Sequence, residues 1–192
     1  TLKIKISQKL KNSKTQSLIF ETYGMSETLS HIALKQIYPI AEEYFKVLDD
    51  VEIYLDERGC LQISAPKLNS ELLSTNDLIE IKNDKEFKFL GRIDNVINSA
   101  GLKIYPEQLE SLVKKEIANE VVFLGIQDDL LGQKLILVIE GEENENINQQ
   151  LLKINYPSKN HAPKEIIFIK TFPRIPNGKI NRKELQAHIS DV

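Results

Sequence analysis

Several features that mark particular classes of protein are rare or absent in this sequence of 192 residues. It contains a single cysteine, Cys60, which excludes an internal disulfide framework and a cysteine-based zinc site and is typical of a reducing cytoplasm. Its eight glycines are scattered, so no glycine-rich phosphate-binding loop can be built from them. The longest apolar runs, such as residues 135–139, are far too short to cross a bilayer. We therefore expect a cytoplasmic protein without membrane insertion.

The sequence also lacks a large excess of charge of either sign. Its 25 lysines and arginines nearly balance its 28 aspartates and glutamates, which leaves a net charge of −3. Such a chain has no overall field that attracts nucleic acid or an anionic membrane. A basic loop at residues 174–183 has no aromatic side chain near it for base stacking except Phe172. We therefore expect no nucleic-acid partner.

Apolar residues make up 41% of the chain, which is enough for one large or two small globular domains. The sequence pattern changes near Gly91, so we predict two units, residues 1–90 and residues 91–192. The first is rich in predicted strands and the second mixes strands with helices. The predicted fold class is α+β.

The first unit has the alternating pattern of antiparallel strands. Alternating or apolar runs predict strands at residues 1–7, 51–55, 61–63, 78–82 and 87–90. Gly59 suits a hairpin turn between the second and third of these, and residues 83–84 suit a turn between the last two. The unit begins abruptly, as though partner strands lay upstream. We expect exposed strand surface there, with a homodimer as one consequence.

The second unit has a clear helix that begins at Pro106, a residue that fits the first helical position. Its apolar face consists of Leu109, Leu112, Val113 and Ile117. Apolar runs predict strands at residues 121–126, 135–139 and 164–170, and helical spacing predicts further helices around residues 147–154 and 185–189. The unit is therefore predicted to be a compact α+β domain.

The segment Tyr23-Gly24-Met25-Ser26-Glu27-Thr28 follows an apolar run that ends at Phe20. A hydroxyl beside a carboxylate at the end of a strand can bind a phosphate and its Mg²⁺ together. Tyr23 offers a ring face on which a base can stack. In the alternative interpretation, Ser26 or Thr28 is the N-cap of a helix or turn. This segment by itself favours the alternative.

A second candidate is Asp77, which ends the polar segment 74–77 before a strand that we predict to begin at Leu78. A carboxylate there can accept hydrogen bonds from both hydroxyls of a ribose. The alternative is that this aspartate caps a turn at the entrance of the strand, which is the commoner use of such a residue.

A third candidate is the segment of residues 91–110, at the boundary between the two units. Few residues pack at such a boundary, so Arg92, Ile93 and Asp94 can absorb backbone rotation as a hinge. The alternative is an ordinary linker followed by a hairpin. The length of the segment and the regular placement of its glycine and proline residues favour the hinge.

The fourth candidate is the segment of residues 173–185. Two prolines stiffen a loop, and Asn177-Gly178 makes a tight turn that presents Lys179 at its tip. A lysine ammonium there can be delivered to a phosphate or a carboxylate as a point charge. The alternative, a basic solvated loop before a helix, is favoured by composition alone.

Taken together and in this order, the four segments resemble the adenylate-forming superfamily, which includes acyl- and aryl-CoA ligases, peptide-synthetase adenylation domains and luciferases. The resemblance covers nearly the whole chain. Residues 21–33, 60–66, 95–101 and 122–141 are most similar to the o-succinylbenzoate–CoA ligases of menaquinone biosynthesis. The resemblance implies that residues 1–90 are the β-rich end of the large AMP-binding domain and that residues 91–192 are a small, mobile C-terminal domain.

The resemblance also implies roles for residues that bind ATP or AMP. Tyr23 would lie against the adenine, and Ser26, where the family usually has threonine, would contact the α-phosphate. Glu27 would help to hold Mg²⁺. Asp77 would bind the ribose hydroxyls, and Arg92 would add a second contact to the ribose.

Further roles implied by the resemblance concern the two half-reactions. Lys179 would be the catalytic lysine that bridges the carboxylate substrate and the α-phosphate during adenylation. Asp94 would be the hinge of a rotation that exchanges Lys179 for the Gly101 turn. Gly101 would then line the passage of the CoA pantetheine, and Lys103 would face CoA.

Ser30 and His31 follow the ATP motif closely enough to reach the acyl substrate, where a hydroxyl or imidazole suits the second carboxylate of succinylbenzoate. Simple packing is an equal alternative for His31. His161 and His188 have no metal-like spacing. The substrates implied are a carboxylic acid, ATP and CoA, with Mg²⁺ as the cofactor.

The family also carries a Ser/Thr/Gly-rich loop for the β- and γ-phosphates, and this chain has none. We therefore expect the chain to be the C-terminal part of a longer acid–CoA ligase and to be inactive alone. The alternatives are another aryl- or acyl-CoA ligase, an adenylation domain that passes its acyl group to a carrier protein, and a non-catalytic module that binds a nucleotide or a partner.

Overall fold

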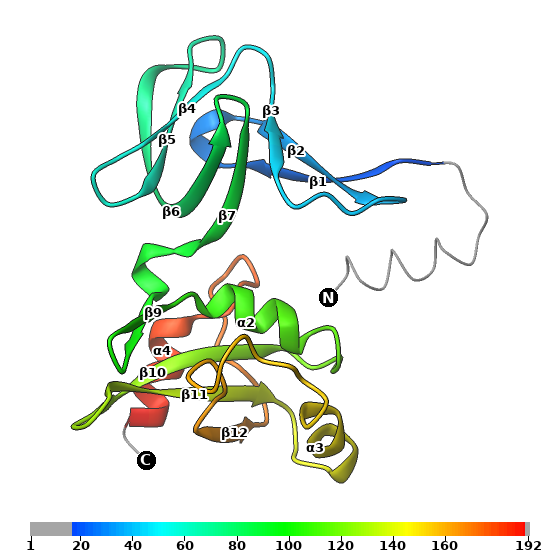
Figure 1. Cartoon of the computed structure of the whole chain (residues 1–192), viewed down its shortest axis with the longest axis vertical. Coiled ribbons are helices and arrows are strands. Elements are labelled where there is room, and N and C mark those ends of the chain that lie inside the picture. The colour runs from blue at the N-terminus through cyan, green and yellow to red at the C-terminus, as the bar shows by residue number, and fades with distance from the viewer. Residues whose placement is uncertain (1–16, 191–192) are drawn as a thin grey trace. The chain divides into compact units, whose positions relative to one another are not determined.

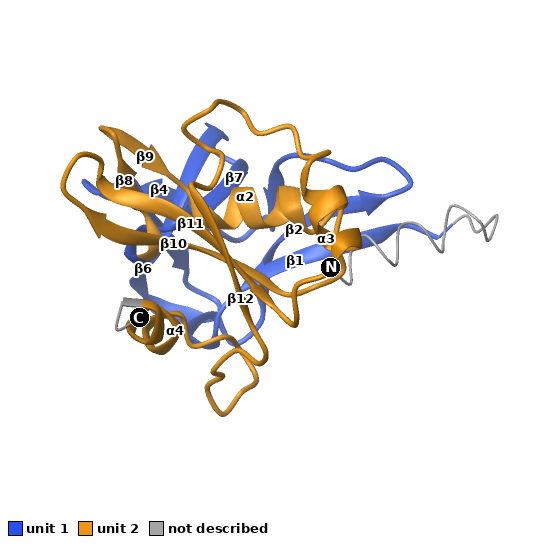
Figure 2. Cartoon of the chain, turned by 90° about the horizontal axis from the view of Figure 1, so that it is seen from below, with its two compact units in different colours: residues 1–94 blue, residues 95–192 orange. Residues whose placement is uncertain are grey.

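A computed structural model describes residues 17–190 of the chain, so the strand predicted at residues 1–7 lies outside the described residues (Figure 1). The chain divides into two compact units, Thr1–Asp94 and Asn95–Val192 (Figure 2). Strands predominate and helices are interspersed, which confirms the predicted α+β class. No helix in the described part of the chain combines the length and the apolar character needed to cross a bilayer.

The first unit is a seven-stranded antiparallel sheet with the strand order β1-β2-β3-β7-β6-β5-β4 (Figure 1). The strands are β1 (Ile19–Gly24), β2 (His31–Tyr38), β3 (Phe45–Val47), β4 (Glu52–Leu55), β5 (Cys60–Ala65), β6 (Asn69–Asn83) and β7 (Glu86–Arg92). Two short 3₁₀ helices follow β1 and β7, namely η1 (Ser26–Thr28) and η2 (Ile93–Asn95).

Both predicted hairpins of this unit are confirmed, β4 with β5 and β6 with β7. The predicted start of β6 at Leu78 is wrong, because the strand begins at Asn69. Its first part is rich in asparagine, serine and glutamate, which have little strand propensity, yet its backbone pairs with β5. Asp77 therefore lies inside a strand rather than at a strand entrance, so the interpretation of this residue as a cap there is wrong as well.

One core holds the first unit together, and Phe87, Leu61, Ile63 and Ile32 are fully buried in it. Alternate side chains of a strand point to opposite faces, and β1 follows this rule with half-buried and exposed residues in turn. The alternation directs Tyr23 of β1 to the core, where its ring packs on the edge of the cluster. Burial on this edge fixes the ring in place.

The second unit contains a smaller sheet with the order β10-β11-β8-β9, and β12 pairs in parallel with β11. Its strands are β8 (Ile97–Ser99), β9 (Leu102–Ile104), β10 (Val121–Asp128), β11 (Gly132–Glu140) and β12 (Glu165–Ile169). Its helices are α2 (Pro106–Val113), α3 (Glu145–Leu151) and α4 (Arg182–Ser190). The predicted helix at Pro106 is confirmed, but it ends at Val113, so Ile117 lies beyond it and is not on its apolar face as predicted. The three predicted strands are confirmed.

Strands β10 and β11 are buried on both faces, which explains their continuous apolar runs. Val121 and Phe123 belong to one core together with residues of α2 and α3. Val122 and Leu124 belong to a second core together with Leu185 of α4. The sheet is therefore the central layer of this unit.

A buried ion pair links α4 to α2 within the second unit. Arg182 of α4 lies 2.6 Å from each carboxylate oxygen of Glu110 of α2, and Glu110 also accepts from the backbone N–H of Phe123 at 2.9 Å. Burial raises the pKa of Glu110, and the Arg182 guanidinium opposes that rise. The pair fixes the first residue of α4 and hence the end of the loop that precedes it.

Candidate functional site

The loop after β1 is held in a tight shape by its own backbone. A Cβ atom at Gly24 would lie 2.6 Å from the carbonyl oxygen of Ser30 and 2.8 Å from Cα of His31, so this close approach requires glycine. The hydroxyl of Thr28 is buried, accepts from the N–H of Met25 at 3.1 Å and lies 2.7 Å from the carbonyl oxygen of Ser30. Thr28 therefore stabilises the loop and is not available to a ligand.

The candidate side chains of this loop, Ser26, Glu27, Ser30 and His31, are all exposed. Within the described residues, no hydrogen bond engages the Ser26 hydroxyl or the Glu27 carboxylate. Ser30 Oγ lies 3.4 Å from Nδ1 of His31, which is a long contact. Met25 occupies the N-cap position of η1, so the interpretation of Ser26 or Thr28 as the N-cap is wrong.

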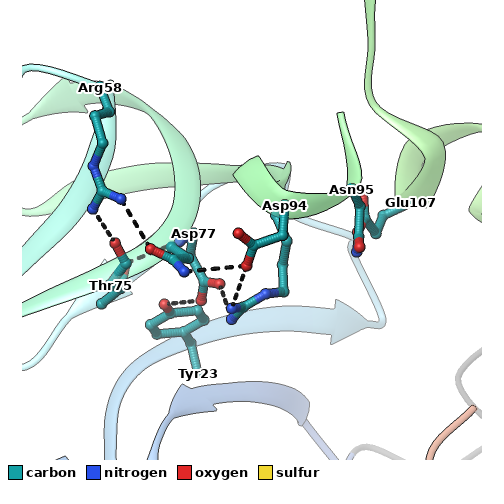
Figure 3. A network of polar contacts seen from close by, with 9 residues as sticks. Tyr23, Arg58, Thr75, Asp77, Asp94, Asn95 and Glu107 are labelled. Atoms are coloured by element: carbon teal, nitrogen blue, oxygen red, sulfur yellow. Dashed lines mark hydrogen bonds and ion pairs between the residues drawn. The ribbon is translucent and has the colours of Figure 1, made fainter. Parts of the chain in front are cut away.

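Tyr23 and Asp77 come together in the first unit (Figure 3), and Arg92 joins them. Asp77 and Arg92 are cross-strand partners of β6 and β7, and Arg92 Nη1 donates to Asp77 Oδ1 at 3.0 Å. The Tyr23 hydroxyl donates to the other oxygen, Asp77 Oδ2, at 2.5 Å. Burial raises the pKa of Tyr23 well above its ordinary value, and the carboxylate of Asp77 adds to the rise. Tyr23 is thus a neutral hydrogen-bond donor.

The ring of Tyr23 is held by aromatic neighbours as well. It makes edge contacts with Phe45 and Phe87, at centroid distances of 5.8 and 5.2 Å, and lies 6.5 Å from Phe89. Such contacts are favourable for aromatic pairs. The ring is therefore held in place by its neighbours and is half-buried.

The same contacts extend to Asp94 (Figure 3), and one of them comes from Asn76, for which the sequence predicted no role of its own. Asp94 Oδ2 accepts from Arg92 Nη2 at 3.2 Å and from the side-chain amide of Asn76 at 3.1 Å. We call Tyr23, Asn76, Asp77, Arg92 and Asp94 the Asp77 network. Asn76 stands directly before Asp77, and that adjacency was the one signal available for it.

Arg58, in the turn between β4 and β5, supports this network from outside. It donates to the side-chain oxygen of Asn76 at 3.0 Å and to the backbone oxygen of Thr75 at 2.9 Å. Its other partner is Asp56, which accepts at 2.9 Å. No sequence pattern indicated this residue, because its partners lie 17 and 18 positions away.

The boundary between the units falls between Asp94 and Asn95. Asp94 is bound to residues of the first unit, as described. Asn95 donates through its side-chain amide to Glu107 Oε1 of α2 at 2.6 Å, within the second unit. Adjacent residues are thus anchored to different units.

Two other candidates lie in the turn between β8 and β9. Ala100 and Gly101 have φ angles of 50° and 78°, as a two-residue hairpin turn with left-handed residues requires. A Cβ atom at Gly101 would meet no atom within 4 Å, so the conformation rather than crowding inside this unit favours glycine. Lys103 is exposed on β9.

Lys179 lies on an exposed hairpin of the second unit that we call the Lys179 turn, residues 174–180. Gly178 N–H donates to the carbonyl oxygen of Ile175 at 2.8 Å, Ile175 N–H donates to that of Lys179 at 2.9 Å, and Gly178 has a φ angle of 83°. The backbone N–H of Lys179 also donates to the side chain of Asn177 at 3.2 Å. Within the described residues, the ammonium of Lys179 has no partner.

The described residues contain no group of three or more His, Cys, Asp or Glu side chains that could hold a metal ion. A protein-only metal cage is therefore not a feature of residues 17–190. Mg²⁺ is often held differently, by one or two carboxylates together with the phosphates of a substrate and water. The exposed carboxylate of Glu27 beside the Ser26 hydroxyl fits that kind of site.

No family model matches the chain. Several individual proteins are nevertheless similar to it. A 2-succinylbenzoate–CoA ligase of Staphylococcus epidermidis is 32% identical to it over 88% of this chain and 41% of the relative. The long-chain-fatty-acid–CoA ligase FadD13 of Mycobacterium tuberculosis is 28% identical over 60% of this chain and 24% of the relative.

Among solved structures, the o-succinylbenzoate coenzyme A synthetase of Bacillus subtilis, in complex with ATP and magnesium ion, has a similar fold. Its TM-score is 0.74 at 20% identity, over 95% of this chain and 44% of that protein. The chain thus spans about two fifths of the length of the 2-succinylbenzoate–CoA ligases that it matches.

Proposed function

The chain is homologous over most of its length to part of the adenylate-forming acyl-CoA ligases, and from this premise we propose that it belongs to an acid–CoA ligase. In the first half-reaction, the carboxylate of the acid attacks the α-phosphorus of ATP and pyrophosphate leaves. In the second, the thiolate of CoA attacks the acyl carbon and AMP leaves. The observation that carries the proposal is the Asp77 network, which joins side chains suited to a nucleoside.

The network can accept a nucleoside without losing its internal contacts. Each oxygen of Asp77 receives one donor, from Tyr23 or from Arg92, and an ionised carboxylate offers about four acceptor sites. Acceptor sites are thus left for the two hydroxyls of a ribose. Arg92 is exposed and can add a donor, and the ring of Tyr23 offers a surface to the adenine.

The loop after β1 would take the phosphates. The Ser26 hydroxyl would donate to an α-phosphate oxygen, and the Glu27 carboxylate would be a protein ligand of Mg²⁺. When bound, the ion would neutralise charge on the phosphates. Both side chains are exposed and unengaged within the described residues.

Lys179 would act in the first half-reaction. Negative charge gathers on the phosphoryl oxygens as the carboxylate attacks, and a positioned ammonium stabilises it. The positive charge of the Lys179 ammonium would also attract the acid carboxylate towards the phosphorus. The ammonium of Lys179 has no partner within the described residues and stands at the tip of a closed turn, which suits both tasks.

The second half-reaction would use the turn at Gly101. Lys179 and Gly101 lie on different turns of the second unit, so each half-reaction would bring one of them to the nucleotide by rotation at Asp94. Gly101 would leave room for the pantetheine chain, and exposed Lys103 would meet charge on CoA.

For the acid we propose o-succinylbenzoate, which would place the enzyme in menaquinone biosynthesis. The relatives matched over 88% of the chain support this choice. Exposed Ser30 and His31 would contact the second carboxylate of that acid.

The test is pyrophosphate formation by the full-length protein that contains this chain, with ATP, Mg²⁺ and a panel of acids. We expect a strong preference for o-succinylbenzoate, and loss of activity in Lys179→Ala. Activity with none of the acids would refute the proposed function.

A second candidate is a ligase for a fatty acid, which the similarity to FadD13 favours. Pyrophosphate formation with long-chain fatty acids and not with o-succinylbenzoate would select it. The roles proposed for Asp77 and Lys179 would then stay and those of Ser30 and His31 would be discarded.

A further inference from the structure

We propose that Arg174 and Glu140 are positioning residues that hold the Lys179 turn in the orientation needed for adenylation, an inference that rests on the proposed role of Lys179. Neither residue touches the reacting atoms in this proposal. They act through the backbone of the turn.

Arg174 joins the turn to the central sheet of the second unit. Its Nη1 donates to the carbonyl oxygen of Gly178, next to Lys179, at 3.3 Å. Its Nη2 donates to Oε2 of Glu140, the last residue of β11, at 2.7 Å. A single guanidinium thus spans from the tip of the turn to the end of a buried strand, which the fixed fork of arginine makes possible.

Glu140 is itself held in place, so the carboxylate that binds Arg174 is fixed. Its other oxygen, Oε1, accepts from the backbone N–H of Phe172 at 2.8 Å, and its backbone N–H donates to Glu120 at 2.9 Å. The side chain of Glu140 is 20% exposed and that of Arg174 is 37% exposed. The burial of Glu140 limits the competition of water for its carboxylate.

The turn has few other attachments to the sheet. Residues 174–179 are all exposed, and Phe172 and Ile180 on either side pack into or against the core beneath α4. The backbone bonds that close the turn shape it but do not attach its tip to β11. The Glu140–Arg174 pair does attach it.

The pair also arranges the charge of the turn. Arg174 is neutralised by Glu140, while the ammonium of Lys179 is unpaired within the described residues. An acidic partner close to Lys179 would compete with the phosphate for it. Placing the carboxylate of Glu140 on Arg174 leaves the lysine free for its substrate.

The first measurement is amide hydrogen exchange in the full-length protein that contains this chain. The amides of Ile175 and Gly178 close the turn, so their exchange reports its order. We expect exchange to become severalfold faster in Arg174→Met and to stay unchanged in Lys179→Ala. The matched control is Lys134→Met, which removes an exposed ion pair with Glu165 in the same unit.

The second measurement separates the half-reactions. In Arg174→Met we expect pyrophosphate formation to fall about 10- to 100-fold, the range that a misplaced catalytic group produces. Thioester formation from chemically prepared acyl-adenylate and CoA should be unchanged, because Lys179 has no role in it. Arg174→Lys keeps the charge without the fork and should lie between the parent and Arg174→Met.

The outcomes separate this proposal from the proposed function. Slower adenylation with faster exchange at the turn supports the positioning role. Unchanged adenylation in both Arg174 variants, an unchanged exchange rate, or an equal loss in the thioester step overturns it. If the parent protein activates no acid, the proposed function fails, and the exchange rates still decide whether Arg174 orders the turn.

Discussion

The Asp77 network in the first unit and the Lys179 turn in the second are built in opposite ways. Each charged group of the network is bound by at least one other member of it, and the ring of Tyr23 is packed among phenylalanines. In the turn, the backbone is closed by hydrogen bonds while the ammonium of Lys179 has no partner within the described residues.

Under the roles proposed above, this difference would let one chain meet two requirements. Groups that hold a ligand in a fixed place gain from being cross-linked to one another, because less motion is lost on binding. A cation that must meet a substrate charge has to be unpaired beforehand. Substitutions in the network should therefore change both stability and binding, whereas substitution of Lys179 should change activity alone.

The largest effect is expected for Lys179→Ala in the full-length protein. Loss of its charge should lower pyrophosphate formation about 10²- to 10³-fold, as for other groups that stabilise charge in a transition state. Because Lys179 is exposed, the free energy of unfolding should change by less than about 0.5 kcal/mol. Lys183→Ala, at the next exposed cation, is the matched control, and an equal loss of activity there would contradict the assignment.

The next effect is expected for Asp77→Asn. It removes the charged acceptor shared by Tyr23 and Arg92, so the free energy of unfolding should fall by about 2 kcal/mol. The KM for ATP should rise as well. Denaturant unfolding and pyrophosphate release measure the two effects. Asp50→Asn, in the exposed pair with Lys67, should change neither.

A smaller effect is expected for Tyr23→Phe. It keeps the ring contacts and removes the hydrogen bond to Asp77, so the free energy of unfolding should fall by about 1 kcal/mol. The KM for ATP should change little if the ring is what meets the adenine. Tyr23→Ala removes the ring as well and should raise the KM for ATP. Equal KM values in the two variants would sink the proposed role of the ring.

The smallest effect is expected for Asn76→Ala, which cuts the links to Asp94 and Arg58. These contacts are exposed, so the free energy of unfolding should fall by less than about 1 kcal/mol. Hydrogen exchange at residues 92–95 should nevertheless become faster. Asn83→Ala, which removes an exposed hydrogen bond to Glu86, should leave that exchange unchanged.

The sequence predicted the elements better than their connections. Period-two alternation and turn residues located the hairpins, and helical spacing located α2, because these signals are local. The link from Tyr23 to Asp77 spans 54 positions and joins β1 to β6, which are not neighbours in the sheet. Such a contact depends on strand order and side-chain reach, which periodicity does not contain. Arg58 and Glu140 were not singled out for this reason, and Asn76 and Arg174 lie in candidate segments but were given no role of their own.

The start of β6 shows a second limit of prediction from the sequence. Its polar residues have weak strand propensity, and only pairing with β5 makes them a strand. Propensity therefore placed Asp77 at a boundary, whereas the sheet places it opposite Arg92. Asp77 stays a predicted site residue, and its surroundings were predicted wrongly.

The anchoring of Asp94 and Asn95 has a consequence for torsion angles. Asp94 is bound to Asn76 and Arg92 on one side, and Asn95 to Glu107 on the other. The peptide group between them is planar and resists twisting. With both side chains bound, ψ of Asp94 and φ of Asn95 are the two backbone dihedrals between the anchors, so the rotation proposed at Asp94 would be confined to these two angles.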